Sequence, residues 1–129
     1  MNPSIAAYFD EIESRLISNE IVYSFRIIRR QVSATDGKYR VKLVFVDNSE
    51  AEFYLYVIES GGRIVLKKYS FHWQGSDETL IRRWDNAPHH PNLPGEPHHV
   101  HQSDGSIDGM PNVPDADFVL AYIEKQIKS

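Results

Sequence analysis

Apolar residues recur at helical spacing near both ends of the chain. Intervals of three or four residues predict an amphipathic helix over about residues 3 to 18, with Asn2 as its N-terminal cap. A second helix is predicted from about Pro114 or Asp115 to Lys128. Its first turn is acidic and its last turn carries lysines, which complements the dipole of a helix.

Between these helices the apolar period falls to two residues, and β-branched and aromatic residues are frequent. This pattern predicts five strands. They run from about Ile21 through Ile28, Tyr39 to Asp47, Ala51 to Glu59, Arg63 to Gln74, and Thr79 to Asn86. The fourth strand needs a bulge near Lys67 and Lys68, because its apolar residues change parity there.

The first two strands are joined by a turn at residues 34–37. A three-residue loop with Gly37 in a left-handed bulge places both apolar sets on one face, so we predict that register. It sets Arg30 across from Lys42, and like charges that face each other are destabilising. Either an anion such as RNA or an acidic partner neutralises these cations, or their side chains reach water or Glu52. The basic group on this opposite face comprises Arg26, Arg30, Arg40 and Lys42.

The chain changes in composition after its fifth predicted strand. All six histidines lie between His72 and His101, and six of the seven prolines lie between Pro88 and Pro114. We expect a loop of about 27 residues there, since closely spaced prolines oppose regular structure. Residues 1–129 are therefore predicted to form a single α+β domain. It has a curved antiparallel sheet of about five strands, both terminal helices on one face, and a long Pro/His-rich loop over the opposite face or the sheet edge.

The amino-acid composition excludes several kinds of functional site. The chain has no cysteine, which excludes disulfides, thiolate metal sites and a cysteine nucleophile. Residues 21–87 carry eleven Lys/Arg against eight Asp/Glu, and residues 88–129 carry two against six. The mildly basic middle permits an anionic ligand without indicating a dedicated nucleic-acid binder. No export signal and no membrane-length apolar run is evident, so we expect a cytoplasmic protein.

Two histidine blocks and one strand segment carry a family resemblance. They are Tyr69-Ser70-Phe71-His72-Trp73, Arg82-Arg83-Trp84-Asp85-Asn86-Ala87-Pro88-His89-His90, and Pro97-His98-His99-Val100-His101. In order and spacing these segments resemble the TumE-type toxins of bacterial and archaeal toxin–antitoxin systems, over most of the chain. The resemblance implies a small toxin neutralised by a cognate TumA-like antitoxin, which is similar to helix-turn-helix DNA-binding proteins. Glu96 and Val100 depart from residues that family members often carry.

We favour a metal-independent ribonuclease as the activity. Cleavage through the RNA 2′-hydroxyl needs a base, an acid and a cation for the developing phosphorane charge. Histidine serves as base or acid, arginine holds the phosphate, and Asp85 orients an imidazole. Trp73, Trp84 or Tyr69, if exposed, would stack on a base, whereas the other interpretation of the two tryptophans is packing in the core or at its rim. Candidate catalytic residues are Arg83, Asp85, His89, His90, His98, His99 and His101. Candidate RNA-binding residues are Arg26, Arg30, Arg40, Lys42, Arg82 and Trp84.

Two alternatives stay open. In an extended segment His99 and His101 point the same way, and with His89 or His90 they would hold a divalent metal such as zinc or nickel, with Asp85 as an oxygen ligand. Otherwise the histidines are satisfied hydrogen-bonding groups, the loop binds RNA or the antitoxin without turnover, and Arg83 pairs with Asp85. The favoured mechanism needs no cofactor. None of these interpretations excludes a homodimer.

Overall fold

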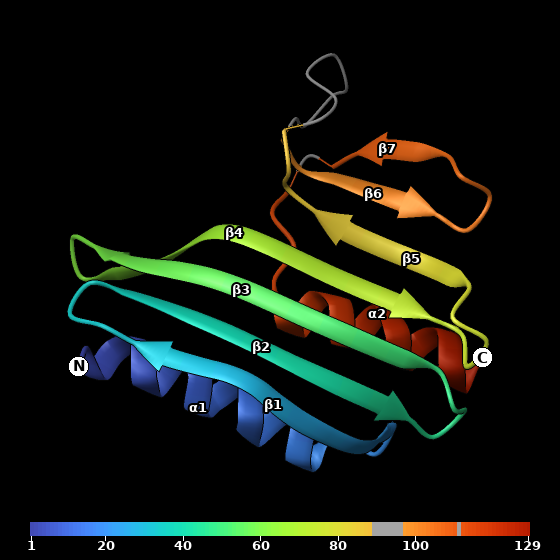
Figure 1. The fold of residues 1–129 in the computed structure, drawn as a ribbon, viewed down its shortest axis with the longest axis horizontal. Coiled ribbons are helices and arrows are strands. Elements are labelled where there is room, and N and C mark those ends of the chain that lie inside the picture. Colours follow the sequence, from blue (N-terminus) through green and yellow to red (C-terminus); the bar gives the residue numbers. More distant parts are fainter. Residues whose placement is uncertain (89–96, 111) are drawn as a thin grey trace.

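The described part of the chain forms one antiparallel sheet with a helix before it and a helix after it (Figure 1). The computed structural model describes residues 1–88, 97–110 and 112–129. In these residues the elements are α1 (Pro3–Ser18), β1 (Val22–Val32), β2 (Asp36–Phe45), β3 (Glu50–Ser60), β4 (Arg63–Gln74), β5 (Leu80–Asp85), β6 (His99–Gln102), β7 (Ile107–Gly109) and α2 (Ala116–Lys128). Each strand pairs with its sequence neighbours, in the order β1 to β7. The predicted α+β class is confirmed.

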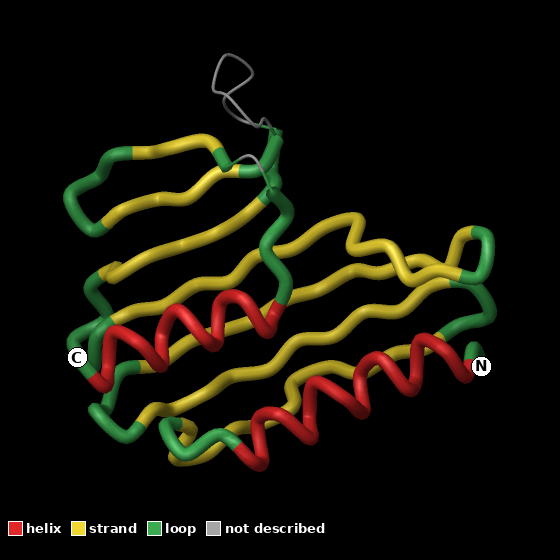
Figure 2. Tube along the Cα trace, turned by 180° about the vertical axis from the view of Figure 1, so that it is seen from behind, coloured by secondary structure: helices red, strands yellow, loops and turns green. Residues whose placement is uncertain are grey.

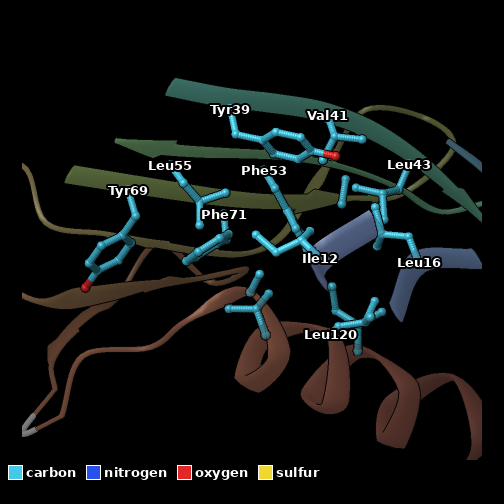
Figure 3. Packing of buried hydrophobic residues seen from close by; sticks show 14 of the residues in the cluster. Ile12, Leu16, Tyr39, Val41, Leu43, Phe53, Leu55, Tyr69, Phe71 and Leu120 are labelled. Atoms are coloured by element: carbon cyan, nitrogen blue, oxygen red, sulfur yellow. The ribbon is translucent and has the colours of Figure 1, made fainter. Parts of the chain in front are cut away.

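The core lies between one face of the sheet and the two helices. Figure 2 shows both helices on the same side of the sheet, as predicted. Alternate residues of β2, β3 and β4 point to that side, so pairs such as Val41 opposite Phe53 and Leu55 opposite Tyr69 are buried together. Figure 3 shows these side chains on the side of the sheet that faces Ile12 and Leu16 of α1 and Leu120 of α2. Burial of each large side chain contributes about 1.5 to 3 kcal/mol, which holds the layers together.

Asn2 fixes the start of α1 against the sheet. Its Oδ1 accepts a hydrogen bond from the Ile5 N–H at 3.0 Å, which confirms the predicted cap. Its Nδ2 donates to the carbonyl of Ala34 at 3.0 Å and to Glu59 Oε1 at 2.8 Å. One side chain therefore joins the helix to the β1–β2 turn and to β3.

The β1–β2 hairpin has a different register from the predicted one. Gly37 lies within β2 opposite Val32, and Arg30 lies opposite Tyr39 instead of Lys42. β1 has an irregularity between Ile27 and Arg29. Odd-numbered residues of β1 pair with odd-numbered residues of β2 only before this irregularity, for example Ile27 with Val41. The predicted bulge at Gly37 is therefore wrong, because the extra residue is accommodated inside β1.

The stretch after β5 contains two strands where none was predicted. β6 pairs with β5, and β7 pairs with β6, so the described sheet has seven strands where about five were expected. Between Pro97 and Pro111 the sequence has no proline, and Gly105 adopts a φ of 88° in the turn that joins the two strands. The predicted bulge in β4 is confirmed, since Tyr56 pairs with Lys68 and Val57 with Leu66. No helix in the described residues has the length and apolar character of a membrane span.

Gly37→Ala should destabilise the protein, because the new Cβ would lie 2.6 Å from Ile5 Cγ2 and 2.9 Å from Phe9 Cε2. Overpacking of this kind lowers the free energy of unfolding by about 1 to 3 kcal/mol. Urea denaturation measures the change. Ser4→Ala, at an exposed position on the same helix, is the control and should stay within about 0.5 kcal/mol of the wild type. Equal stability of both variants would contradict the close contact between α1 and β2.

Candidate functional site

Two rows of cross-strand neighbours cross the face of the sheet that the helices leave open. Residues directly opposite each other on antiparallel strands point to the same side. The first row comprises Lys42, Glu52, His72, Arg83 and His101, and the second comprises Arg40, Tyr54, Ser70, Asp85 and His99. We call this surface the open face. Candidate cations from β2 and candidate catalytic residues from β5 and β6 therefore share one surface.

A buried carboxylate lies at the end of β5. Asp85 is only 5% exposed, although it lies on the open face. Four groups surround its oxygens: His99 Nε2 at 2.7 Å and the Ala87 N–H at 3.2 Å from Oδ1, and Arg83 Nε at 2.9 Å and His101 Nε2 at 3.3 Å from Oδ2. Because a buried charge needs such partners, these contacts fix the positions of three side chains at once. We call Asp85, His99 and His101 the Asp85 cluster.

His99 is held from both sides of its ring. Its Nδ1 lies 2.8 Å from the carbonyl oxygen of Pro97, which only accepts hydrogen bonds, so Nδ1 carries a proton. Its Nε2 faces the Asp85 carboxylate, so a proton or another cation lies between these two atoms. The His99 side chain is 0% exposed. Because the side chain offers no surface to a substrate, we expect His99 to be a positioning residue.

Arg83 and His101 form the accessible part of the site. Their side chains are 38% and 24% exposed. Arg83 also donates from Nη1 to His72 Nδ1 at 3.2 Å, and His72 Nε2 then donates to Gln74 Oε1 at 3.1 Å. The predicted Arg83–Asp85 ion pair is confirmed. The sequence suggested His72 as a structural residue among aromatics. It lies on the open face, opposite Glu52 and Arg83, and the alternation of residues within β4 could have predicted that position.

A groove of about 850 Å³ runs along the open face beside Arg83. Its charged lining comprises Arg26, Arg40, Lys42, Arg83, Glu50, Glu52 and Glu78. Glu52 pairs with Arg40 and, at 3.8 Å, with Lys42, as one of the two interpretations of this basic group expected. The groove thus carries a small excess of cations, part of which an internal carboxylate already neutralises.

Two predicted RNA-binding arginines lie on the helix side of the sheet. Arg30 binds Glu13 at 2.7 Å and Asp10 at 2.8 Å on α1, because the irregularity in β1 reverses its parity. Arg82 stacks over the ring of Tyr122 at 4.5 Å. The expectation that Arg30 lines the basic face with Arg26, Arg40 and Lys42 is wrong, and RNA binding by Arg82 stays a prediction.

The aromatic residues proposed to stack on bases are buried. Trp84 packs edge-on against Tyr122 at 5.4 Å, and Trp73 donates to Ser49 Oγ at 3.0 Å. Burial raises the pKa of Tyr69, so its hydroxyl is protonated, and this hydroxyl shares a hydrogen bond with His98 Nδ1 at 2.9 Å. Trp73, Trp84 and Tyr69 are therefore not exposed for base stacking, and core packing, the other interpretation of the two tryptophans, is confirmed. His98 stacks on Tyr69 and takes no part in the Asp85 cluster.

Two of the candidate histidines, His89 and His90, lie outside the described residues. Their catalytic role, and the place of His90 among metal ligands, stay predictions. For the described residues, the prediction that His99 and His101 point the same way is confirmed, since both Nε2 atoms face Asp85.

Comparison with protein-family models decides the family. The model described as Toxin TumE matches residues 12–129. The chain belongs to the TumE toxin family. Comparison with curated proteins and with solved structures gave no match. Membership of a toxin family implies a cognate antitoxin. In this TumE protein the matched region contains every strand of the described sheet, together with the Asp85 cluster and the groove.

We expect His99 and His101 to differ in their effect on stability. His99→Ala should lower the free energy of unfolding by about 2 to 4 kcal/mol, because it leaves a cavity and removes a partner of buried Asp85. His101→Ala should cost less than half as much, since its side chain is partly exposed. Urea denaturation of both variants in the presence of a chelator measures the difference. Equal losses would contradict the assignment of His99 as the positioning residue.

Proposed function

We propose that this TumE protein is a toxin that acts on RNA, binding a single-stranded segment across the open face and cleaving it beside Asp85. The observation that carries the proposal is the row from Lys42 through His72 to Arg83, which leads along the groove to the Asp85 cluster. Three strand spacings separate its ends, or about 14 Å. That length suits a short single-stranded segment.

The chemistry of the groove supports an RNA ligand. Arg26, Lys42 and Arg83 offer cations to phosphates, and arginine matches phosphate geometry well. Arg40 lies 4.6 Å from the centre of the Tyr54 ring, and both groups present flat surfaces on which a base stacks. Glu52 competes with phosphate for Arg40 and Lys42, which lowers the positive charge that the groove offers to a nucleic acid. We therefore propose a short single strand, which needs few phosphate contacts, as the ligand.

Arg83 is suited to hold the phosphate that reacts. In the reaction, the 2′-hydroxyl loses its proton and its oxygen bonds to phosphorus. The bond from phosphorus to the 5′-oxygen breaks, and that oxygen takes up a proton. The products are a 2′,3′-cyclic phosphate and a 5′-hydroxyl. A guanidinium beside the phosphate stabilises the charge that develops on its oxygens, and Arg83 is exposed enough to reach it.

The described residues supply one histidine that suits an acid–base role beside Asp85. Among the described histidines, His101 alone is both beside Asp85 and partly exposed. A metal-independent reaction needs a second accessible group, so that one group acts as the general base and the other as the general acid. Catalysis by His89 or His90 stays a prediction. Cleavage that persists in the presence of a chelator would support that mechanism.

The cognate antitoxin is proposed to be a helix-turn-helix protein encoded beside this chain. A short reading frame of that kind next to the gene would support the pairing. We propose that the toxin acts on RNA in the cytoplasm. The following experiment distinguishes RNA cleavage from a non-catalytic mode, in which the groove binds RNA or the antitoxin without turnover.

Lys42→Glu should weaken RNA binding by roughly tenfold, because it removes a phosphate contact and adds a repulsive charge. Growth arrest on induced expression should be lost in parallel. Lys125→Glu, on the exposed side of α2, makes the same charge change away from the groove and is the matched control. Binding to a short single-stranded RNA is measured at several salt concentrations, and cleavage of total RNA is followed at pH values between about 5 and 8.

Two results would count against the proposal. Full toxicity of Lys42→Glu, with unchanged RNA binding, would remove the groove from the function. Growth arrest without RNA cleavage at any of these pH values would favour the non-catalytic mode.

A further inference from the structure

We propose that the Asp85 cluster binds one divalent transition-metal ion, with zinc as the representative. The ligands are the carboxylate of Asp85, His99 Nε2 and His101 Nε2. Metal binding is tested on the protein alone, without RNA, although it bears on the catalytic role proposed for His101.

The three groups converge as metal ligands do. One ligand atom from each residue lies within 4.8 Å of the other two. Around a tetrahedral ion with bonds of about 2.0 to 2.1 Å, neighbouring ligand atoms lie roughly 3.3 Å apart. His101 Nε2 and Asp85 Oδ2 are 3.3 Å apart, and His99 Nε2 and Asp85 Oδ1 are 2.7 Å apart. These distances join the two histidines to the two different oxygens of the carboxylate; the first matches the spacing of ligands around an ion, and the second needs to widen by about 0.6 Å.

The surroundings orient the ligands. Metal-binding histidines usually donate their second ring N–H to a carbonyl or carboxylate, which fixes the tautomer. His99 does so through Nδ1 to the Pro97 carbonyl, leaving its Nε2 lone pair toward Asp85. Asp85 in turn accepts from Arg83 Nε at 2.9 Å. Cross-strand pairing of Asp85 with His99 fixes the spacing of their backbones.

The donor set selects the kind of ion. Two imidazoles and one carboxylate suit zinc, nickel and related ions, whereas magnesium and calcium prefer more oxygen ligands. Three protein ligands leave a further position for water or for a phosphate oxygen. Arg83 contacts Asp85 Oδ2 at 2.9 Å and also lines the groove, so the proposed ion would lie close to the groove.

A bound ion gives His101 a different role from the one expected of it. As a ligand, its Nε2 no longer carries a proton, so His101 is not a general acid or base in the loaded protein. The ion also satisfies the requirement for a positive charge between His99 Nε2 and the carboxylate. The competing explanation is a proton at that place, and it is distinguished by direct titration.

The test titrates the full chain, freed of metal by a chelator, with zinc chloride in a calorimeter. We expect one zinc ion per chain and no comparable binding of magnesium. His101→Ala and Asp85→Asn should each weaken zinc binding at least tenfold, since even residues behind the ligands change affinity by 10- to 100-fold. His72→Ala is the matched control, because its ring contacts Arg83 and Gln74 and not the cluster. Its zinc affinity should stay within about threefold. Far-ultraviolet circular dichroism confirms that each variant is folded.

Absence of zinc binding by the wild type would overturn the proposal. Unchanged affinity in both folded variants would also overturn it, because the ion would then lie on other residues. The titration contains no RNA, so its failure is distinct from failure of the proposed function. Lys42→Glu should keep wild-type zinc affinity while losing toxicity, and loss of zinc binding in that variant would contradict the separation of the two sites.

Discussion

The burial of one carboxylate at the end of β5 determines how the rest of the site is arranged. Asp85 is removed from water, and a buried carboxylate is tolerated only when donors or cations surround it. Those partners come from its own strand and from β6, which has to lie beside β5 to supply them. The pairing that extends the sheet beyond β5 and the chemistry of the open face are therefore consequences of the same constraint.

The helices cover one face of the sheet, so the other face is free to be polar. Charges alternate along it, from Lys42 to Glu52 and then through His72 to Arg83. Each cation is close to an acceptor, which limits repulsion within the row. An anion that enters the groove has to displace Glu52 from its partners, and the binding free energy is reduced by that competition.

Sequence periodicity predicts much of this fold, because the core-facing residues of α1, α2 and β2 to β4 repeat at regular spacing. It fails where a tertiary contact chooses the conformation. Gly37 resembled a turn residue, yet it is a glycine because Ile5 and Phe9 leave no space for a Cβ. In β5, alternation separates Arg82 and Trp84 from Arg83 and Asp85, but the large apolar surface of Trp84 decides which pair faces the helices. The strand β6 is short and follows several prolines, so its local pattern gives little warning of pairing. Convergence of His99 and His101 was predictable, because residues two apart in a strand share a face.

The exposures of the four site residues define the direction from which a ligand approaches. His99 and Asp85 are almost completely covered, so neither offers a surface to an incoming molecule. Arg83 and His101 are partly exposed and lie opposite each other on neighbouring strands, and Arg83 also lines the groove. A molecule in the groove therefore meets the guanidinium before it reaches the carboxylate. The buried pair sets the geometry and the exposed pair makes the contact, so changes to the two pairs should separate into effects on stability and effects on binding.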